Sequence, residues 1–263
     1  MIVEQVWTAN AYRNFNYLIA CPETGDALAV DPLDYRKCLH SATENGWTIT
    51  QILNTHEHGD HTGGNRAIVK KTGAKVIAHS NAKGRIPKMT QGVGAGSIIK
   101  VGKTVELECL DTPGHTMSHI CVLSHTEQPA LFSGDTLFNA GAGNCHNGGH
   151  PNQLYETFAH QLEQLDENTL IYPGHDYLIN NLRFTLDREP SNETAKRMLT
   201  EYEDHDPNKA LVTTLAMERK INTFFRLKNP EVIRYLQEQF PEIGDSPSEK
   251  TVFLRLRELR NKW

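Results

Sequence analysis

The feature that most constrains this chain is a run of seven residues holding four potential metal ligands, Thr55-His56-Glu57-His58-Gly59-Asp60-His61. The run follows the β-rich stretch 51–54, so it lies where a strand ends in a loop, the usual position of a site in an α/β sheet. Alternate residues of an extended segment point the same way, so His56 and His58 can bind one ion. A turn at the glycine can direct Asp60 and His61 toward a second ion. A lone histidine or aspartate usually belongs to a solvated polar loop, but four ligand types in this order favour a metal site.

Three later segments each place one ligand-type side chain just past a predicted strand and beside a glycine. They are Asp111-Thr112-Pro113-Gly114-His115, Ser133-Gly134-Asp135-Thr136 and Tyr172-Pro173-Gly174-His175. Each segment alone is a weak signal, since many turns contain a glycine and a polar residue. Together with the first cluster they complete a set of five histidines and two aspartates, which suits zinc, iron or manganese.

The first two thirds of the chain alternate between strand and helix patterns. Runs rich in β-branched and apolar residues predict strands over 2–7, 16–20, 27–30, 52–54, 75–79, 104–110, 119–124, 130–132 and 169–172. Helices are predicted over 35–45, 64–72 and 152–165. The glycine-rich run 91–97 has no following lysine and no helix start, so it predicts a loop rather than a phosphate-binding turn.

Beyond residue 177 the pattern becomes helical. Two helices are expected within 178–205, where Pro190 ends the first and Ser191 or Asn192 can cap the second. A loop-like passage then extends to about residue 228, and helices follow over 231–239 and 247–261. We therefore divide the chain near residue 174 into an α/β catalytic domain, 1–174, and an all-helical substrate-binding domain, 175–263.

Charge, cysteine usage and hydropathy narrow the class of protein. With 27 basic and 32 acidic residues the net charge is −5, so no overall positive field attracts nucleic acid or an anionic membrane. Five cysteines without a CxxC pair argue against a disulfide framework and against a thiolate zinc site. The chain begins without a signal-peptide pattern and has no apolar run of about 18 residues. We therefore expect a cytoplasmic protein, acting as a monomer, with no nucleic-acid or membrane partner.

The order of motifs HxHxDH, PGH, GDT and PGH resembles the metallo-β-lactamase superfamily. The resemblance implies an α/β (α+β) fold, a four-layer αββα sandwich with two metals at one edge of two facing sheets. By that resemblance the first metal is held by His56, His58 and His115, the second by Asp60, His61 and His175, and Asp135 bridges them. Spacing alone does not assign a ligand to an ion. Asp31, at another strand end, is either a turn aspartate or a carboxylate that accepts a ligand histidine's N–H.

A dinuclear centre of this kind predicts hydrolysis. Two divalent transition metals per chain, zinc first with iron or manganese also compatible, can share one water and lower its pKa toward about 7. The metal-bound hydroxide, with Asp60 and Asp135 as the catalytic carboxylates, then attacks a carbonyl. A thioester suits this chemistry because its thiol leaving group has a pKa near about 8.5 and can depart as the anion.

The substrate is suggested by the C-terminal part. The passages 175–177 and 180–184, the helical tail and the terminal Arg257 and Arg260 look like glyoxalase II, the hydroxyacylglutathione hydrolase family. The resemblance implies hydrolysis of S-D-lactoylglutathione to D-lactate and glutathione, the second step of methylglyoxal detoxification. It also implies that Tyr177, Arg257 and Arg260 bind the glutathione moiety. From charge alone, a basic surface helix is the competing interpretation of the two arginines.

The sequence departs from the family pattern in the glycine-rich stretch 141–148. Asn144 stands where the family has a cation, and His146 stands where it has an aromatic residue; both are candidate substrate-binding residues. One charged hydrogen bond, worth about 1.5 to 3 kcal/mol, is missing at Asn144. We therefore expect weaker glutathione binding or a different thiol carrier. A smaller departure is Ser118, where the family favours glycine.

Other functions fit the sequence less well. A related enzyme acting on another thioester is one alternative, and a persulfide dioxygenase with a single iron is another. The sequence has all the ligands for a second metal, which argues against a dioxygenase with a single iron. A nuclease would need a basic surface for phosphates, and a non-catalytic binding module has no need for seven ligands. His79 and His119 fall outside the motifs, so we expect hydrogen-bonded structural roles for them.

Overall fold

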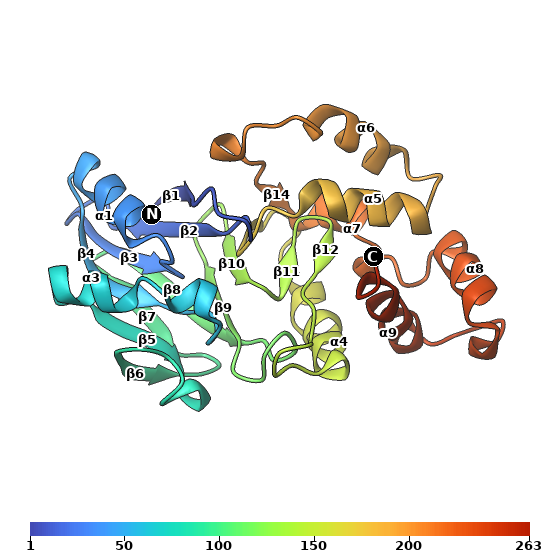
Figure 1. Cartoon of the computed structure of the whole chain (residues 1–263), viewed down its shortest axis with the longest axis horizontal. Coiled ribbons are helices and arrows are strands. Elements are labelled where there is room, and N and C mark those ends of the chain that lie inside the picture. Colours follow the sequence, from blue (N-terminus) through green and yellow to red (C-terminus); the bar gives the residue numbers. More distant parts are fainter.

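The computed structural model describes all 263 residues. Two six-stranded β-sheets face each other in its centre (Figure 1). The first sheet has the strand order β1 (Ile2–Trp7), β2 (Phe15–Ala20), β3 (Asp26–Val30), β4 (Thr48–Leu53), β5 (Lys75–His79) and β6 (Met89–Val93). The second has the order β14 (Thr213–Thr214), β13 (Leu170–Pro173), β10 (Ala130–Gly134), β9 (Ile120–Ser124), β8 (Val105–Asp111) and β7 (Ile98–Val101). A small ribbon pairs β11 (Leu137–Phe138) with β12 (Gly141–Ala142).

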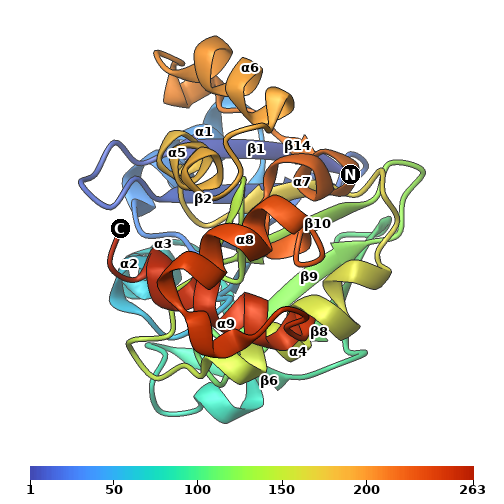
Figure 2. The same cartoon turned by 90° about the vertical axis from the view of Figure 1, so that its right-hand side faces the viewer.

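Helices cover the outer face of each sheet. Helices α1 (Tyr35–Glu44) and α3 (Asn65–Thr72) lie on the first sheet, and α4 (Pro151–His160) lies on the second (Figure 1). The C-terminal helices are α5 (Leu178–Arg188), α6 (Glu193–Tyr202), α7 (Leu215–Ile221), α8 (Pro230–Gln239) and α9 (Glu249–Arg260). Figure 2 looks onto this helical end, with α8 and α9 toward the viewer. The αββα sandwich with a helical C-terminal region is confirmed, and no helix has the length and apolar character needed to cross a membrane.

Side-chain alternation along the strands builds these layers. On β2, Phe15, Tyr17 and Ile19 enter the core between the two sheets, while Leu18 points to the other face, beneath α1 and α3. This period of two is what a strand buried on both faces requires. A second core joins the outer face of the second sheet to Phe158 of α4 and to the C-terminal helices.

Most predicted elements are present within a few residues of their expected bounds. Asn192 caps α6 by accepting a hydrogen bond from Ala195 N at 2.9 Å, as one of the two expected caps. The predicted helix over 152–165 ends at His160, and a short 3-10 turn follows over Leu162–Gln164.

Two predicted loops were wrong in part. The stretch expected to be a loop over 91–97 includes the end of β6, an edge strand that is largely exposed and therefore has no alternating apolar pattern. The passage expected to be irregular up to residue 228 contains β14 and α7. Strand β14 has only two residues and α7 only seven, so neither gives a readable periodicity.

The division of the chain near residue 174 stays a proposal. Strand β13 ends at Pro173 and α5 begins at Leu178. However, β14 returns to the second sheet and pairs with β13 from beyond that point. The helical part is therefore attached to the sandwich by a strand as well as by side-chain packing.

Candidate metal centre

All seven predicted ligands converge at one end of the two sheets. They come from the loop after β4, from the short helix α2 (Gly59–Thr62), from the loop between β8 and β9, and from the ends of β10 and β13. These are neighbouring strand ends, which explains why residues far apart in the chain meet. The side chains form two triads that share one carboxylate; they are His56, His58 and His115, then Asp60, His61 and His175, with Asp135 between them.

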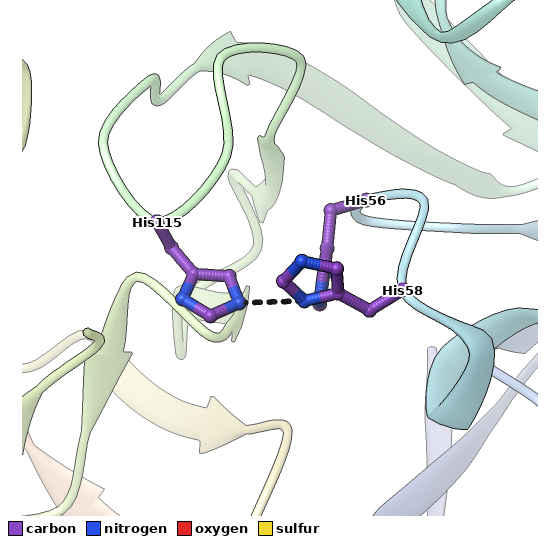
Figure 3. A group of neighbouring side chains, drawn as sticks. All are labelled: His56, His58 and His115. Atoms are coloured by element: carbon purple, nitrogen blue, oxygen red, sulfur yellow. Dashed lines mark hydrogen bonds between the residues drawn. The ribbon is translucent and has the colours of Figure 1, made fainter. Parts of the chain in front are cut away.

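The first triad brings three ring nitrogens together. His58 Nδ1 lies 3.0 Å from His56 Nε2 and 3.0 Å from His115 Nε2. Figure 3 shows the His58 and His115 rings pointing toward each other from separate loops. The side chains of His56 and His115 are buried, whereas His58 is partly exposed. The triad therefore has one side open to solvent.

The outer nitrogens of this triad reveal the protonation of the inner ones. His115 Nδ1 lies 2.7 Å from the carbonyl oxygen of Asn144, and His58 Nε2 lies 3.0 Å from that of Asn147. A carbonyl only accepts hydrogen bonds, so both outer nitrogens carry the proton. A neutral imidazole has one N–H, so His58 Nδ1 and His115 Nε2 face each other with lone pairs. Such an arrangement is repulsive unless a cation lies between them, and the residues therefore fit a metal ion.

The second triad also brings its ring nitrogens together. His61 Nε2 and His175 Nε2 are 3.2 Å apart, and each lies 3.5 Å from Asp60 Oδ2. The outer nitrogen of His61 donates to Asp31 Oδ2 at 3.0 Å, and that of His175 donates to the carbonyl of Tyr12 at 2.7 Å. Burial alone would lower the pKa of His61, but Asp135 and Asp31 outweigh it and raise the pKa well above its usual value. Without a metal, His61 Nε2 therefore also holds a proton, which a bound cation would displace. This set also fits a cation.

Asp135 lies between the triads. Its Oδ1 is 3.4 Å from His61 Nε2, and its Oδ2 is 3.2 Å from His175 Nε2 and 3.5 Å from His115 Nε2. Asp135 Oδ1 is buried and has no hydrogen-bond donor within the chain. A buried carboxylate oxygen without a donor is costly, and a metal ion satisfies it. The position thus suits a carboxylate shared by two ions.

Burial and neighbouring charges put several donors in the form that metals require. Burial lowers the pKa of His56 and of His115, so both imidazoles are neutral. Burial alone would raise the pKa of Asp135, but the nearby His175 and His61 outweigh it and lower the pKa well below its usual value. Asp135 is therefore a carboxylate across the ordinary pH range.

Asp31 accepts a ligand histidine's N–H, which was one of its two expected roles. It is 2% exposed and also accepts from Thr55 N at 2.8 Å and from Thr55 Oγ1 at 2.6 Å. Thr55 Oγ1 in turn lies 3.0 Å from His56 Nδ1. One buried carboxylate thus orients His61 directly and His56 through Thr55.

Glu57 lies inside the ligand motif, and its role could not be predicted from the sequence. Its carboxylate accepts from Ser118 Oγ at 2.7 Å, from Thr116 Oγ1 at 3.0 Å and from Arg85 Nη1 at 2.5 Å. Burial alone would raise the pKa of Glu57, but these hydrogen bonds lower it below its usual value. Glu57 therefore ties the loop of His58 to the loop of His115. Ser118, noted above as a departure from the family pattern, supplies one of the bonds.

The expected structural roles of His79 and His119 are confirmed. Asp135 N donates to His119 Nε2 at 3.1 Å, and the hydroxyls of Thr112 and Thr136 lie 2.9 and 3.1 Å from His119 Nδ1. His79 Nδ1 accepts from Asn81 N at 3.1 Å. His119 therefore fixes the backbone of the shared carboxylate without entering either triad.

The candidate substrate-binding residues lie in different environments. The Tyr177 ring stacks on His175, with centroids 4.9 Å apart, and burial raises the pKa of its phenol. Arg260 Nη2 donates to Asn181 Oδ1 at 3.1 Å. Arg257 is only 4% exposed and lines a cavity of about 570 Å³ together with His146. Asn144 and His146 are exposed.

Comparison with known proteins gives full-length matches. Residues 176–263 match the family described as hydroxyacylglutathione hydrolase C-terminus, and residues 22–95 match the metallo-beta-lactamase superfamily. The chain is 67% identical to a hydroxyacylglutathione hydrolase of Polaromonas sp. (strain JS666) and 64% identical to one of Nitrosococcus oceani, with 100% of both chains covered in each case. A crystal structure of ETHE1 from Myxococcus xanthus has a similar fold, with TM-score 0.67, 25% identity, and coverage of 99% of this chain and 98% of that one.

Proposed function

Since the chain belongs to the hydroxyacylglutathione hydrolase (glyoxalase II) family of the metallo-β-lactamase superfamily, we propose that its two triads hold the two metal ions of a thioester hydrolase. The enzyme hydrolyses S-2-hydroxyacylglutathione, and S-D-lactoylglutathione yields D-lactate and glutathione in methylglyoxal detoxification. The observation that supports this most directly is the pair of triads whose inner ring nitrogens converge and that share Asp135.

The proposed ligand roles follow from that geometry. The first ion is held by His56, His58 and His115, the second by Asp60, His61 and His175, with Asp135 shared. Bound divalent cations supply Lewis acidity to a carbonyl oxygen and lower the pKa of a water molecule. The chain itself adds Asp60 and Asp135, whose carboxylates can accept the proton of a nucleophilic water. A thiolate leaves without a strong general acid.

We propose that the thiol carrier extends from the metal centre along Tyr177 and Arg260 toward the exposed Asn144 and His146. The raised pKa of Tyr177 keeps its hydroxyl a neutral donor. Arg257 Nη2 makes no hydrogen bond within the chain, so it remains able to meet the carrier. The absence of a cation at residue 144 predicts a higher KM than in relatives that have one.

Several finer features of the same proposal follow. Histidine and carboxylate donors without thiolate suit zinc best among common cellular divalent ions, with iron or manganese possible. The net charge of −5 and the reduced cysteines fit a cytoplasmic monomer that acts on a small molecule and binds no nucleic acid or membrane.

The test combines metal content with substrate preference. Purified protein is analysed for metal per chain by elemental mass spectrometry, and hydrolysis of S-D-lactoylglutathione is compared with that of acylated coenzyme A and acylated cysteine. We expect two transition metals per chain and preference for the glutathione thioester. One iron per chain with oxygen uptake, or equal rates on all three thioesters, would contradict the proposal.

A further inference from the structure

The segment 139–147, which we call the support loop, connects the metal centre with the helical part of the chain. It begins a few residues after Asp135 and includes Asn144 and Asn147, whose carbonyls accept from the first triad. Helix α5 donates to it from Asn181 Nδ2 to Asn139 O at 2.9 Å. Just after α7, Asn222 Nδ2 donates to Gly141 O at 3.1 Å. The C-terminal helices therefore bind the loop at several successive peptide groups.

Arg257 on α9 makes the contact nearest to the metal centre. Its Nη1 donates to Ala142 O at 2.8 Å and to Gly143 O at 3.0 Å, and its Nε donates to Asn261 Oδ1 at 3.0 Å. The guanidinium lies over the Phe224 ring, 5.6 Å from its centroid, and the residue is 4% exposed. A buried guanidinium held by three hydrogen bonds has little freedom, so it fixes the two peptide groups that it meets.

Gly143, which Arg257 holds in place, contacts Asp135 on one side and precedes Asn144 on the other. Its N–H donates to Thr136 O at 3.1 Å, and a Cβ at this position would lie 1.8 Å from Asp135 O. The backbone of the support loop thus packs directly on the residue that the triads share. Asn144, whose carbonyl accepts from His115, is the next residue along the chain.

We propose that Arg257 is a positioning residue of the metal centre, which holds the support loop so that the Asn144 and Asn147 carbonyls orient His115 and His58. The inference rests on the ligand set proposed above and adds a role to Arg257 besides contact with the thiol carrier. Asn144 and Asn147 are themselves exposed and lie outside any helix or strand, so the anchoring at Ala142 and Gly143 decides where their carbonyls lie. The second triad uses neither carbonyl.

This role predicts a selective loss of one metal. Removing the partner of a metal-bound histidine commonly costs 10-fold to 100-fold in metal affinity. Arg257→Met keeps the apolar stem over Phe224 but removes the donors, so we expect a loss of about that size at the first triad. Arg257→Lys retains a donor within reach of the same carbonyls and should restore part of the affinity. Arg234→Met, which removes an exposed arginine from α8, is the matched control.

The experiment measures metal retention in the loaded protein against a graded series of chelator concentrations. Wild type and Arg234→Met should lose their ions at the same concentrations, whereas Arg257→Met should lose one ion at 10-fold to 100-fold less chelator and retain the other. The site that binds its ion more weakly is identified by combining Arg257→Met with the loss of one ligand from either triad. Combined with His175→Ala, which leaves the first triad whole, Arg257→Met should raise the Kd of the remaining ion. Combined with His58→Ala, it should not.

The outcomes separate this role from the alternatives. A purely structural arginine would lower the Tm of the metal-free protein, but the increase in Tm on adding zinc would stay as in wild type. A purely substrate-binding arginine would raise KM and leave both Kd values unchanged. Either result overturns the proposal. Fewer than two ions in the wild type would instead refute the ligand set. If Arg257→Met does not fold, a milder variant, Asn261→Ala, tests the same contact.

Discussion

The two triads are alike in the atoms that face the metal site, and they differ in the groups that hold their outer atoms. Both turn ring nitrogens toward a common point, but most of their outer atoms are held by different parts of the molecule. Two members of the first triad, His58 and His115, rely on carbonyls of the support loop, which the C-terminal helices bind. The third, His56, relies on Asp31 through Thr55. The second triad relies on Asp31, Asn14 and the carbonyl of Tyr12, all in or beside the first sheet. One dinuclear centre therefore depends on two separate packing units.

Burial sharpens this difference. Asp31 is 2% exposed and Asn14 is fully buried, so the support of the second triad is shielded from water. Asn144 and Asn147 are exposed, and His58 is the most accessible histidine of the centre. Exposed backbone held by few contacts opens at a lower free energy than a buried sheet edge. We therefore expect the first triad to release its ion more readily than the second.

The largest effect should come from removing one ligand of either triad. His58→Ala and His175→Ala each leave two donors of the affected triad besides the shared Asp135, so each protein should bind one ion instead of two. Loss of a Lewis acid is worth several kcal/mol of transition-state stabilisation, so kcat for lactoylglutathione should fall on the order of 10³-fold. Metal content and kcat are measured on the same preparations. Loss of both ions in both variants would show that the triads are not separable, and retained thioester cleavage would contradict the assignment.

A smaller effect is expected when the support of the second triad is weakened without touching a ligand. Asp31→Asn keeps the shape but replaces one acceptor oxygen by an N–H donor. An amide nitrogen in place of Oδ2 leaves both His61 Nδ1 and Thr55 Oγ1 without their acceptor, and one in place of Oδ1 leaves Thr55 N without its acceptor. We expect the Kd of the second ion to rise 10-fold to 100-fold, with a smaller change at the first triad through Thr55 and His56.

Asp34→Asn is the control for that variant, because Asp34 only caps α1 and asparagine caps equally well. Chelator titration of the three proteins gives both Kd values. If Asp31→Asn raised the Kd of the first ion more than that of the second, relative to wild type, the assignment of support to each triad would be reversed.

The ligands of the centre could be predicted from the sequence, whereas the groups that hold the outer atoms of these ligands could not. Ligands such as His56 and Asp135 are marked by side-chain type and by their place after strands. The partners of their outer atoms are different, because the carbonyls of Tyr12, Asn144 and Asn147 exist at every residue and carry no side-chain signal. Asp31 was visible but ambiguous, since an aspartate in a turn looks the same in sequence.

The same contrast explains the C-terminal part. Two arginines three residues apart on one helix suggested a shared ligand, yet Arg257 is buried against backbone and Arg260 contacts Asn181. Spacing along one helix predicts a common face, but only the packing of the helix shows what that face meets. The fold was predictable where periodic patterns are long. It was missed at the exposed strand β6 and at β7, β14 and α7, where the patterns are short.

The smallest effect on activity, and a distinct effect on stability, is expected at Glu218 on α7, which holds the support loop through Ala140. Glu218 is fully buried and accepts from Ala140 N at 2.8 Å, Asn222 Nδ2 at 3.1 Å and Thr213 Oγ1 at 2.7 Å. Burial raises the pKa of this carboxyl from 4.5 to about 7, more than the hydrogen bonds lower it.

The sign of the pH dependence follows from that raised pKa. Between pH about 4.5 and about 7 the folded protein holds a proton on Glu218 that the unfolded chain has released, so stability falls as pH rises through this window.

Glutamine resembles the protonated acid, since its carbonyl can accept from Ala140 and Asn222 while its amide donates to Thr213. Glu218→Gln should therefore match wild type near pH 4.5 and exceed it at pH 8 by about 3 kcal/mol at most, from about 2.5 pKa units. Urea unfolding at each pH measures the difference, and exposed Glu238→Gln controls for the lost charge. A constant difference across the pH range would mean that Glu218 is ionised in the folded protein and that the support loop is held by a charge.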